Sequence, residues 1–132
     1  MCSSDLFTLS MLEGVAYSAR LLLNSLQQSA SLRPEIIAHA GGGARSDLWC
    51  QIRADVLGIP IQRLKNTDAG VAGAAMLAGV GAGLFSTFSE ASKRFVQTGQ
   101  RFEPRDELKQ RHDDGFARYQ LLYKQLIPLN AS

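Results

Sequence analysis

Residues 36–49 read IIAHAGGGARSDLW, and this stretch decides the fold. The apolar run that begins at Ile36 contains two β-branched isoleucines and is bounded by turn signals, which favours a short buried strand. Three successive glycines, Gly41–Gly43, follow as a turn. Ser46 is a good helix N-cap, and helical periodicity begins after it. The stretch therefore predicts a strand, a glycine turn and a helix N-terminus, in that order.

This order of elements is typical of an anion-binding site. Glycines let the backbone approach a ligand closely, and the first N–H groups and the macrodipole of the helix favour negative charge. A phosphate, or the edge of a nucleotide, is the expected occupant. The alternative is a tight connection between strand and helix without a ligand, since short glycine runs are common in turns.

Composition narrows the possible partners. The chain has 132 residues, of which 45% are hydrophobic and 20% charged, which suits one globular unit. Its net charge of +2 is small and its basic residues are scattered among acids, so we expect no nucleic-acid partner. No continuous apolar run reaches the roughly 18 residues that a membrane span needs, and no secretory signal is present. We expect a cytoplasmic protein without a membrane partner.

The cysteines and histidines do not form a ligand cluster in the sequence. Cys2 and Cys50 lie far apart and are interpreted as free thiols in a reducing compartment. His39 and His112 are each isolated, which gives no pattern of metal ligands.

Helical patterns dominate the rest of the chain. The capping-box pattern Ser10-x-x-Glu13 starts the first helix, unless that helix begins one turn earlier near Thr8. Its predicted apolar stripe is Leu12, Val15, Ala16, Ala19, Leu22, Leu23 and Leu26. The helix after Ser46 ends at Gly58, a good C′ residue. Further expected elements are a strand over 59–64, helices over 68–79, 86–96 and 105–126, and an extended connector over 100–104. The class is therefore α/β, helix-rich with at least two strands.

The first six residues do not continue this pattern. Cys2–Leu6 has the sequence that a common sequencing-adapter end encodes in one reading frame. We therefore expect residues 1–6 to be a non-native or disordered tail, and residues 129–132 to be a second tail.

Two long segments, Gly41–Trp49 and Gln51–Ile61, resemble the C-terminal domain of the FGGY carbohydrate kinases. Other stretches match features of that family in the same order, namely Leu12–Ala16, Ala72–Ala75, Gly79–Gly83 and Phe102–Pro104 with the closing helix. The resemblance covers nearly all of residues 7 to 128 with family-like spacing. It identifies residues 7–128 as the C-terminal part of the family's ATP-binding domain.

The resemblance implies part of an actin-like ATPase fold, a nucleotide-binding lobe built on a ribonuclease-H-like core. Members of the family transfer a phosphoryl group from ATP, with magnesium, to a sugar or polyol hydroxyl. By position, Gly41, Gly42, Gly43 and Ala44 would give the nucleotide close backbone approach, and Ser46 would offer it a polar contact.

Much of a complete kinase has no counterpart in this sequence. The sugar-binding N-terminal domain, the phosphate loops and the aspartate base of the family are all missing. Asp47, Asp55 and Asp68 are expected to be capping or surface acids instead. We expect a portion that binds ATP or ADP but is inactive alone, with sugar and most magnesium contacts only in the full-length enzyme. Its exposed faces predict self-association into a homo-oligomer or a marginally stable monomer.

Two other classes of function stay open at this point. Gly41-x-Gly43-x-x-Ser46 is one residue away from the dinucleotide fingerprint, and Arg63 lies about 20 residues further on, where an NADP-binding arginine could lie. A fragment of an NADP-binding oxidoreductase is therefore one alternative. The other is a non-catalytic binding module with the same actin-like fold.

Overall fold

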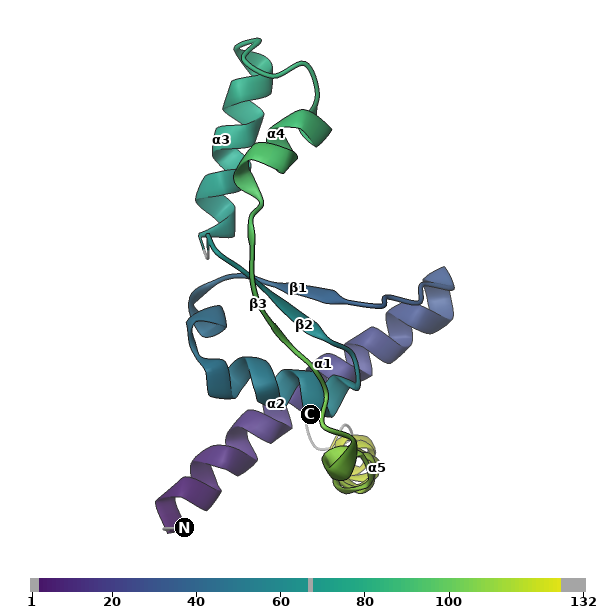
Figure 1. Cartoon of the computed structure of the whole chain (residues 1–132). Coiled ribbons are helices and arrows are strands. Elements are labelled where there is room, and N and C mark those ends of the chain that lie inside the picture. The colour runs from purple at the N-terminus through teal and green to yellow at the C-terminus, as the bar shows by residue number, and fades with distance from the viewer. Residues whose placement is uncertain (1–2, 67, 127–132) are drawn as a thin grey trace.

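The computed structural model of the chain describes residues 3–66 and 68–126 (Figure 1). The α-helices are α1 (Ser3–Ala30), α2 (Asp47–Leu57), α3 (Ala69–Gly81), α4 (Phe88–Phe95) and α5 (Lys109–Leu126). The strands are β1 (Ile37–His39), β2 (Ile61–Leu64) and β3 (Thr98–Phe102), and two short 3₁₀ turns are η1 (Gly42–Arg45) and η2 (Asp106–Leu108). Cys2 and the tail expected at 129–132 lie outside the described residues.

The strands form one small mixed sheet in the order β1-β2-β3. β1 and β2 are parallel, with Ile37 opposite Ile61, and β2 and β3 are antiparallel, with Ile61 opposite Phe102. The register of the second pair shifts between Gln62 and Leu64. The expected helix-rich α/β class is confirmed, but residues 100–102 of the segment expected as an extended connector belong to β3. Its pairing with β2 is non-local, so the local pattern at 100–104 did not reveal a strand.

Helix α2 lies between two layers and is buried on both sides (Figure 1). Towards the sheet, the buried cluster is Cys50, Ala54, Leu57, Ile61 and Phe102. Towards α1 and α5, the buried cluster is Ala16, Tyr17, Ile52, Val56 and Phe116. The glycine turn connects β1 to α2. Because α2 is buried on both sides, the end of the turn that joins α2 is fixed in position.

Helix α1 begins earlier than the sequence pattern indicated. It starts at Ser3 rather than at Ser10 or near Thr8, so the structure continues the helix through Ser3–Leu6 of the expected tail. Ser10 does not cap a helix, because its hydroxyl donates to the carbonyl of Phe7 at 2.8 Å within α1. Whether residues 1–6 are native stays a prediction.

The buried face of α1 also differs from the predicted stripe. Tyr17, which the periodicity placed off the stripe, is buried, whereas Val15 and Leu22 are 60% and 65% exposed. The helix has 28 residues and a mean hydropathy of 1.3 over its most apolar window, so by length and composition it could cross a membrane. The expected absence of a membrane partner stays a prediction. In the fold, however, Ala16 and Tyr17 of α1 pack against α2 and α5, as in the core of a folded domain.

An acid of α2, Asp55, anchors the segment that leads into α5. It was expected at the surface, but its side chain is 1% exposed. Its carboxylate accepts hydrogen bonds from the backbone N–H of Arg105 at 2.9 Å and from the Arg105 guanidinium at 2.6 Å. Gln51 donates to the same carboxylate at 3.0 Å. A buried carboxylate needs this number of donors to compensate for its lost hydration.

The contact between α1 and α5 depends on a glycine. A Cβ atom placed on Gly115 would lie 2.2 Å from the hydroxyl oxygen of Tyr17. That hydroxyl lies 3.3 Å from Nδ1 of the buried His112. Burial raises the pKa of Tyr17 and lowers the pKa of His112, so both groups stay neutral at pH 7. Gly115, which the sequence marks only as a weak helix former, is thus the residue that lets the two helices approach.

We expect Gly115→Ala to lower the free energy of unfolding by about 1–3 kcal/mol, because its methyl group overpacks against Tyr17. Chemical denaturation measures the change. The matched control is Gly14→Ala in α1, where no atom lies within 4 Å of an added Cβ. This control should gain about 0.5–1 kcal/mol from helix propensity. A Gly115→Ala variant as stable as the Gly14→Ala variant would contradict the close contact.

Candidate functional site

The glycine turn after β1 closes as η1 and leads into α2. Gly41 has φ +91°, a left-handed conformation that favours glycine. The N–H of Ala44 donates to the carbonyl of Gly41 at 3.1 Å, and the N–H of Ser46 donates to the carbonyl of Gly43 at 3.2 Å. The predicted order of strand, glycine turn and helix is confirmed, with a 3₁₀ turn in place of an open loop.

The candidate nucleotide-binding residues have different surroundings. Gly42 is exposed, and an added Cβ there would have nothing within 4 Å, so it borders open space. An added Cβ on Gly43 would instead lie 3.0 Å from Cδ1 and Nε1 of Trp49. Ala44 is fully buried, so it supports the turn from beneath and does not give a ligand the close approach expected of it. Gly41 and Gly42 therefore both border open space, and Gly42 is the more exposed of the two.

Ser46 is the N-cap of α2, as its position in the sequence indicates. Its hydroxyl oxygen accepts a hydrogen bond from the N–H of Trp49 at 3.2 Å. A serine hydroxyl carries one donor and two lone pairs, so the O–H of this exposed residue can still donate while the oxygen caps the helix. At the other end of α2, Gly58 has φ 66° and forms the predicted left-handed cap.

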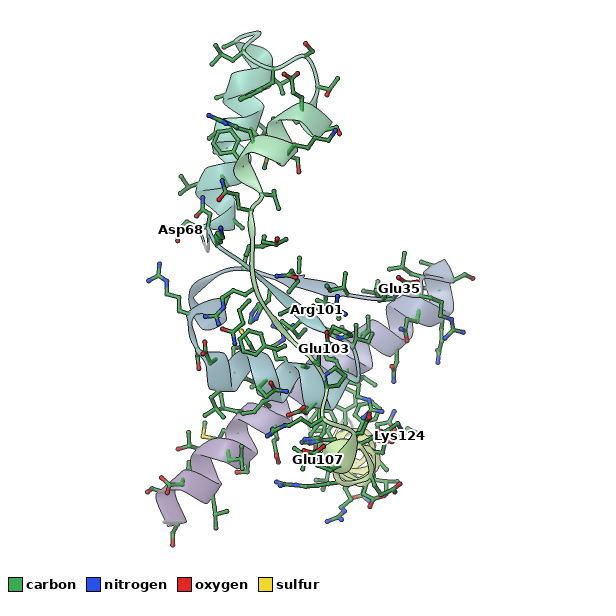
Figure 2. The ribbon with its side chains drawn as sticks, viewed as in Figure 1. Glu35, Asp68, Arg101, Glu103, Glu107 and Lys124 are labelled. Carbon is green, nitrogen blue, oxygen red and sulfur yellow. The ribbon has the colours of Figure 1, made fainter. Side chains whose placement is uncertain are left out.

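A charged groove of about 500 Å³ lies beside the turn. Its lining residues are Arg45, Asp47, Arg63, Leu64, Lys65, Gly99 and Gln100. Within it, Arg63 donates to the carboxylate of Asp47 at 2.6 Å and to the side-chain oxygen of Gln100 at 2.8 Å. At its margin, Arg45 lies 3.8 Å from Asp68, which Figure 2 shows beside the first turn of α3. The groove thus combines basic side chains with the N-terminus of α2.

Three polar residues that sequence reasoning did not connect lie together beneath the turn. Nδ1 of His39 lies 3.5 Å from Sγ of Cys50, and Nη1 of Arg53 lies 3.3 Å from Nε2 of His39. The thiol of Cys50 also donates to the carbonyl of Ala44 at 3.5 Å. Burial lowers the pKa of His39, with Arg53 and Arg63 adding to the effect, and burial raises the pKa of the Cys50 thiol. The sequence signal that could have found this cluster is the spacing of Cys50 and Arg53, which lie three residues apart on one helical face.

The acids near the groove are engaged by arginines. Asp47 pairs with Arg63, and Asp68 lies near Arg45. Over residues 3–66 and 68–126, no group of three or more histidine, cysteine, aspartate or glutamate side chains could hold a metal ion.

Comparison with known proteins identifies the family. Residues 4–82 match the C-terminal domain of the FGGY family of carbohydrate kinases. The chain belongs to this family. The match includes most of α1, so that helix is part of the FGGY domain, and it begins inside the segment expected to be a tail.

Curated FGGY relatives are much longer than this chain. The xylulose kinase of Staphylococcus epidermidis is 33% identical over 127 residues, which are 95% of this chain and 25% of that kinase. The autoinducer-2 kinase of Escherichia coli K12 is 30% identical over 128 residues, 97% of this chain and 24% of that kinase. The chain therefore spans about a quarter of the length of these relatives.

Solved FGGY structures show the same fold. A kinase of Brucella ovis described as a xyloylose kinase superposes with a TM-score of 0.79 at 35% identity, over 93% of this chain and 25% of its own. The glycerol kinase of Plasmodium falciparum, solved with ADP, superposes with a TM-score of 0.70 at 17% identity, over 88% of this chain and 23% of its own. The FGGY kinases have the actin-like ATPase fold, so the partial actin-like lobe predicted from the sequence is confirmed.

We expect Ser46→Ala to destabilise the FGGY domain by about 0.5–2 kcal/mol, because the first turn of α2 loses its side-chain cap. Thermal or urea unfolding measures the loss. Ser46→Asp is the matched control, since aspartate caps as well as serine and adds favourable charge at the helix N-terminus. Equal destabilisation by both substitutions would contradict a capping role.

Proposed function

We propose that this chain is the nucleotide-binding C-terminal portion of an ATP-dependent kinase of sugars or polyols. The observation that carries the proposal is the open space at Gly42, in the turn that leads into the N-terminus of α2. Exposed backbone at the start of a helix offers N–H groups and a favourable dipole to a phosphate. Membership of the FGGY family supports ATP as the source of that phosphate.

The residues around the turn suit one end of an adenine nucleotide. Gly41 and Gly42 allow close approach, Ser46 can donate its O–H, and Arg45 and Lys65 supply positive charge from the lining of the groove. ATP supplies the phosphoryl group that such a kinase transfers. In this proposal the chain binds and orients the nucleotide, while acceptor binding falls to other parts of the full-length enzyme.

Magnesium has no carboxylate cluster to bind among the described residues. Asp47 and Asp68, the acids nearest the turn, each face an arginine. We therefore propose that the full-length enzyme holds the metal mainly through residues outside this chain, and we assign neither a metal ligand nor a catalytic residue here.

The acceptor is proposed as a class and not as a single compound. The similar proteins are named as kinases of xylulose, autoinducer-2, gluconate and glycerol. What these acceptors share is a hydroxyl-rich carbon chain. A cytoplasmic location follows as part of the proposal, because ATP is found there and Cys50 is a free thiol.

The two alternative functions are less well supported. Arg63, the candidate NADP-binding arginine, is held by Asp47 and Gln100, and FGGY membership gives no support to an oxidoreductase. A non-catalytic module with the same fold would differ from the proposed function by failing to bind adenine nucleotides.

We expect the chain to bind ADP weakly, with a Kd near 1 mM, about −4 kcal/mol, because only one side of the site is present. Gly42→Val should abolish this binding, since its side chain would occupy the open space before α2. Competition against a fluorescent adenine nucleotide measures both. We choose Gly42 over Gly43 because a new side chain at Gly43 would also displace Trp49 and so disturb the turn itself.

Gly14→Val is the matched control for Gly42→Val. Gly14 also has open space around an added Cβ, but it belongs to α1 and not to the turn. ADP affinity should stay at the parent value in this variant. If Gly42→Val binds ADP as well as Gly14→Val does, the turn is not the nucleotide site.

We expect no sugar-dependent release of ADP from ATP by this chain alone. Phosphoryl transfer needs an aligned acceptor hydroxyl and a group that takes its proton. Loss of a general base alone costs about 10²- to 10⁴-fold in rate, and loss of acceptor alignment costs more. The assay is ADP release with magnesium over pentuloses, hexuloses and polyols. Turnover that survives purification and disappears in Gly42→Val would show that the chain is a complete enzyme.

A further inference from the structure

We propose that Arg53, His39 and Cys50 form a directed hydrogen-bond chain that ends on the carbonyl of Ala44 and holds the glycine turn in its binding conformation. The three are positioning residues that do not touch the ligand. The proposal rests on the proposed function for what the turn binds. The donor-to-acceptor direction of the hydrogen bonds follows from the chemistry of the side chains alone.

The direction is set by Arg53. A guanidinium has only N–H donors and stays protonated in proteins. Its Nη1 lies 3.3 Å from Nε2 of His39, so Nε2 must accept and must carry a lone pair. The Cζ atom of the guanidinium lies 5.7 Å from the centre of the Trp49 ring, whereas its buried Nε has no hydrogen-bond partner among the described residues.

The remaining protons follow in order. A neutral imidazole whose Nε2 accepts must carry its proton on Nδ1. Nδ1 of His39 lies 3.5 Å from Sγ of Cys50, so the imidazole donates to sulfur. The sulfur keeps its own proton, which points to the carbonyl of Ala44 at 3.5 Å. Each nitrogen, sulfur and oxygen of this hydrogen-bond chain is therefore either a donor or an acceptor in only one way that fits its neighbours.

Burial of His39 and Cys50 favours this neutral arrangement over an ion pair of thiolate and imidazolium. Arg53 from α2 and Arg63 from β2 both face His39 and oppose its protonation. Burial raises the pKa of the Cys50 thiol and Asp47 adds to that effect, and together they outweigh Arg63 and Arg53, which lower it. An imidazolium would also lose the lone pair that accepts from Arg53. The cluster is therefore not an activated nucleophile.

The hydrogen-bond chain joins three secondary-structure elements, β1, η1 and α2. His39 is the last residue of β1, Cys50 and Arg53 lie in α2, and Ala44 lies in η1. Trp49 adds a further contact, because a Cβ atom placed on Gly43 would lie 3.0 Å from its indole and 4.0 Å from Nε2 of His39. A turn fixed in this way presents Gly42 and Ser46 without an ordering cost on binding.

Nitrogen-15 NMR of the histidine side chains tests the direction without any nucleotide. At pH 7.5 we expect His39 to be neutral with its proton on Nδ1, and the His39→Gln variant assigns its signals against those of His112. A proton on Nε2, or an imidazolium, would overturn the proposal.

A matched pair of variants tests the effect on the turn. Cys50→Ser and Cys50→Ala have nearly the same side-chain size, but only serine can both accept from His39 and donate to Ala44. We expect the ADP affinity of Cys50→Ser to stay within about two-fold of the parent and that of Cys50→Ala to fall by about 3- to 10-fold. Emission of Trp49, the single tryptophan of the sequence, should likewise shift only in Cys50→Ala. Equal behaviour of both variants in the emission spectrum would mean that Cys50 acts through packing alone, against the proposal.

A pH titration of Trp49 emission gives the third test. The pKa of His39 is lowered from 6.5. The hydrogen-bond chain is therefore intact above pH 6.5, and it is lost when His39 takes up a proton as the pH falls through its lowered pKa. We expect a step in emission below pH 6.5 that is absent in His39→Gln. A step that persists in this variant would assign it to His112 and would count against the proposal. If no variant binds ADP at all, the proposed function fails, while the NMR and emission results still decide the hydrogen-bond chain.

Discussion

The burial of α2 on both faces is the constraint on which this structure depends. One face of α2 closes the sheet through Cys50, Ala54 and Leu57, and the other receives α1 and α5 through Ile52 and Val56. A helix in this position cannot shift towards either layer without opening a cavity in the other, which costs several kcal/mol per large side chain. The start of α2, and with it the glycine turn, is therefore held by two hydrophobic clusters at once.

Two arginines extend this constraint to the ends of α2. Arg63 of β2 pairs with Asp47 in the first turn of α2, and Arg105 pairs with the buried Asp55 near the last turn. Asp55 is far more buried than Asp47. Substitution of Arg105 would therefore leave a buried carboxylate with fewer hydrogen-bond donors. The same helix thus carries the candidate anion site at its exposed N-terminus and the anchor for α5 on its flank.

Local signals in the sequence predicted the parts of the fold that depend on local chemistry. Ser46 and Gly58 mark the two ends of α2 because capping requires a particular residue type at one position. The identity of the strand before the glycines followed in the same way. Non-local contacts decided the rest. β3 exists because it pairs with β2, and Tyr17 is buried because a glycine nearly one hundred residues later leaves room for its ring. Ala44 illustrates the limit for the site, since its place in a glycine-rich turn indicated contact with a ligand while its burial beneath that turn could be seen only in the structure.

Helices α3 and α4 form a separate pair that meets the glycine turn through the ion pair of Asp68 and Arg45. These two helices pack against each other and stand away from the other helices at the end of β2 and β3 (Figure 1). The antiparallel pair that carries them is irregular between Gln62 and Leu64, where its register shifts. Beyond this irregularity, Asp68 at the N-cap of α3 lies 3.8 Å from Arg45 at the glycine turn. A substitution of Asp68 would therefore remove an ionic contact between the outlying helix pair and the turn that leads into α2.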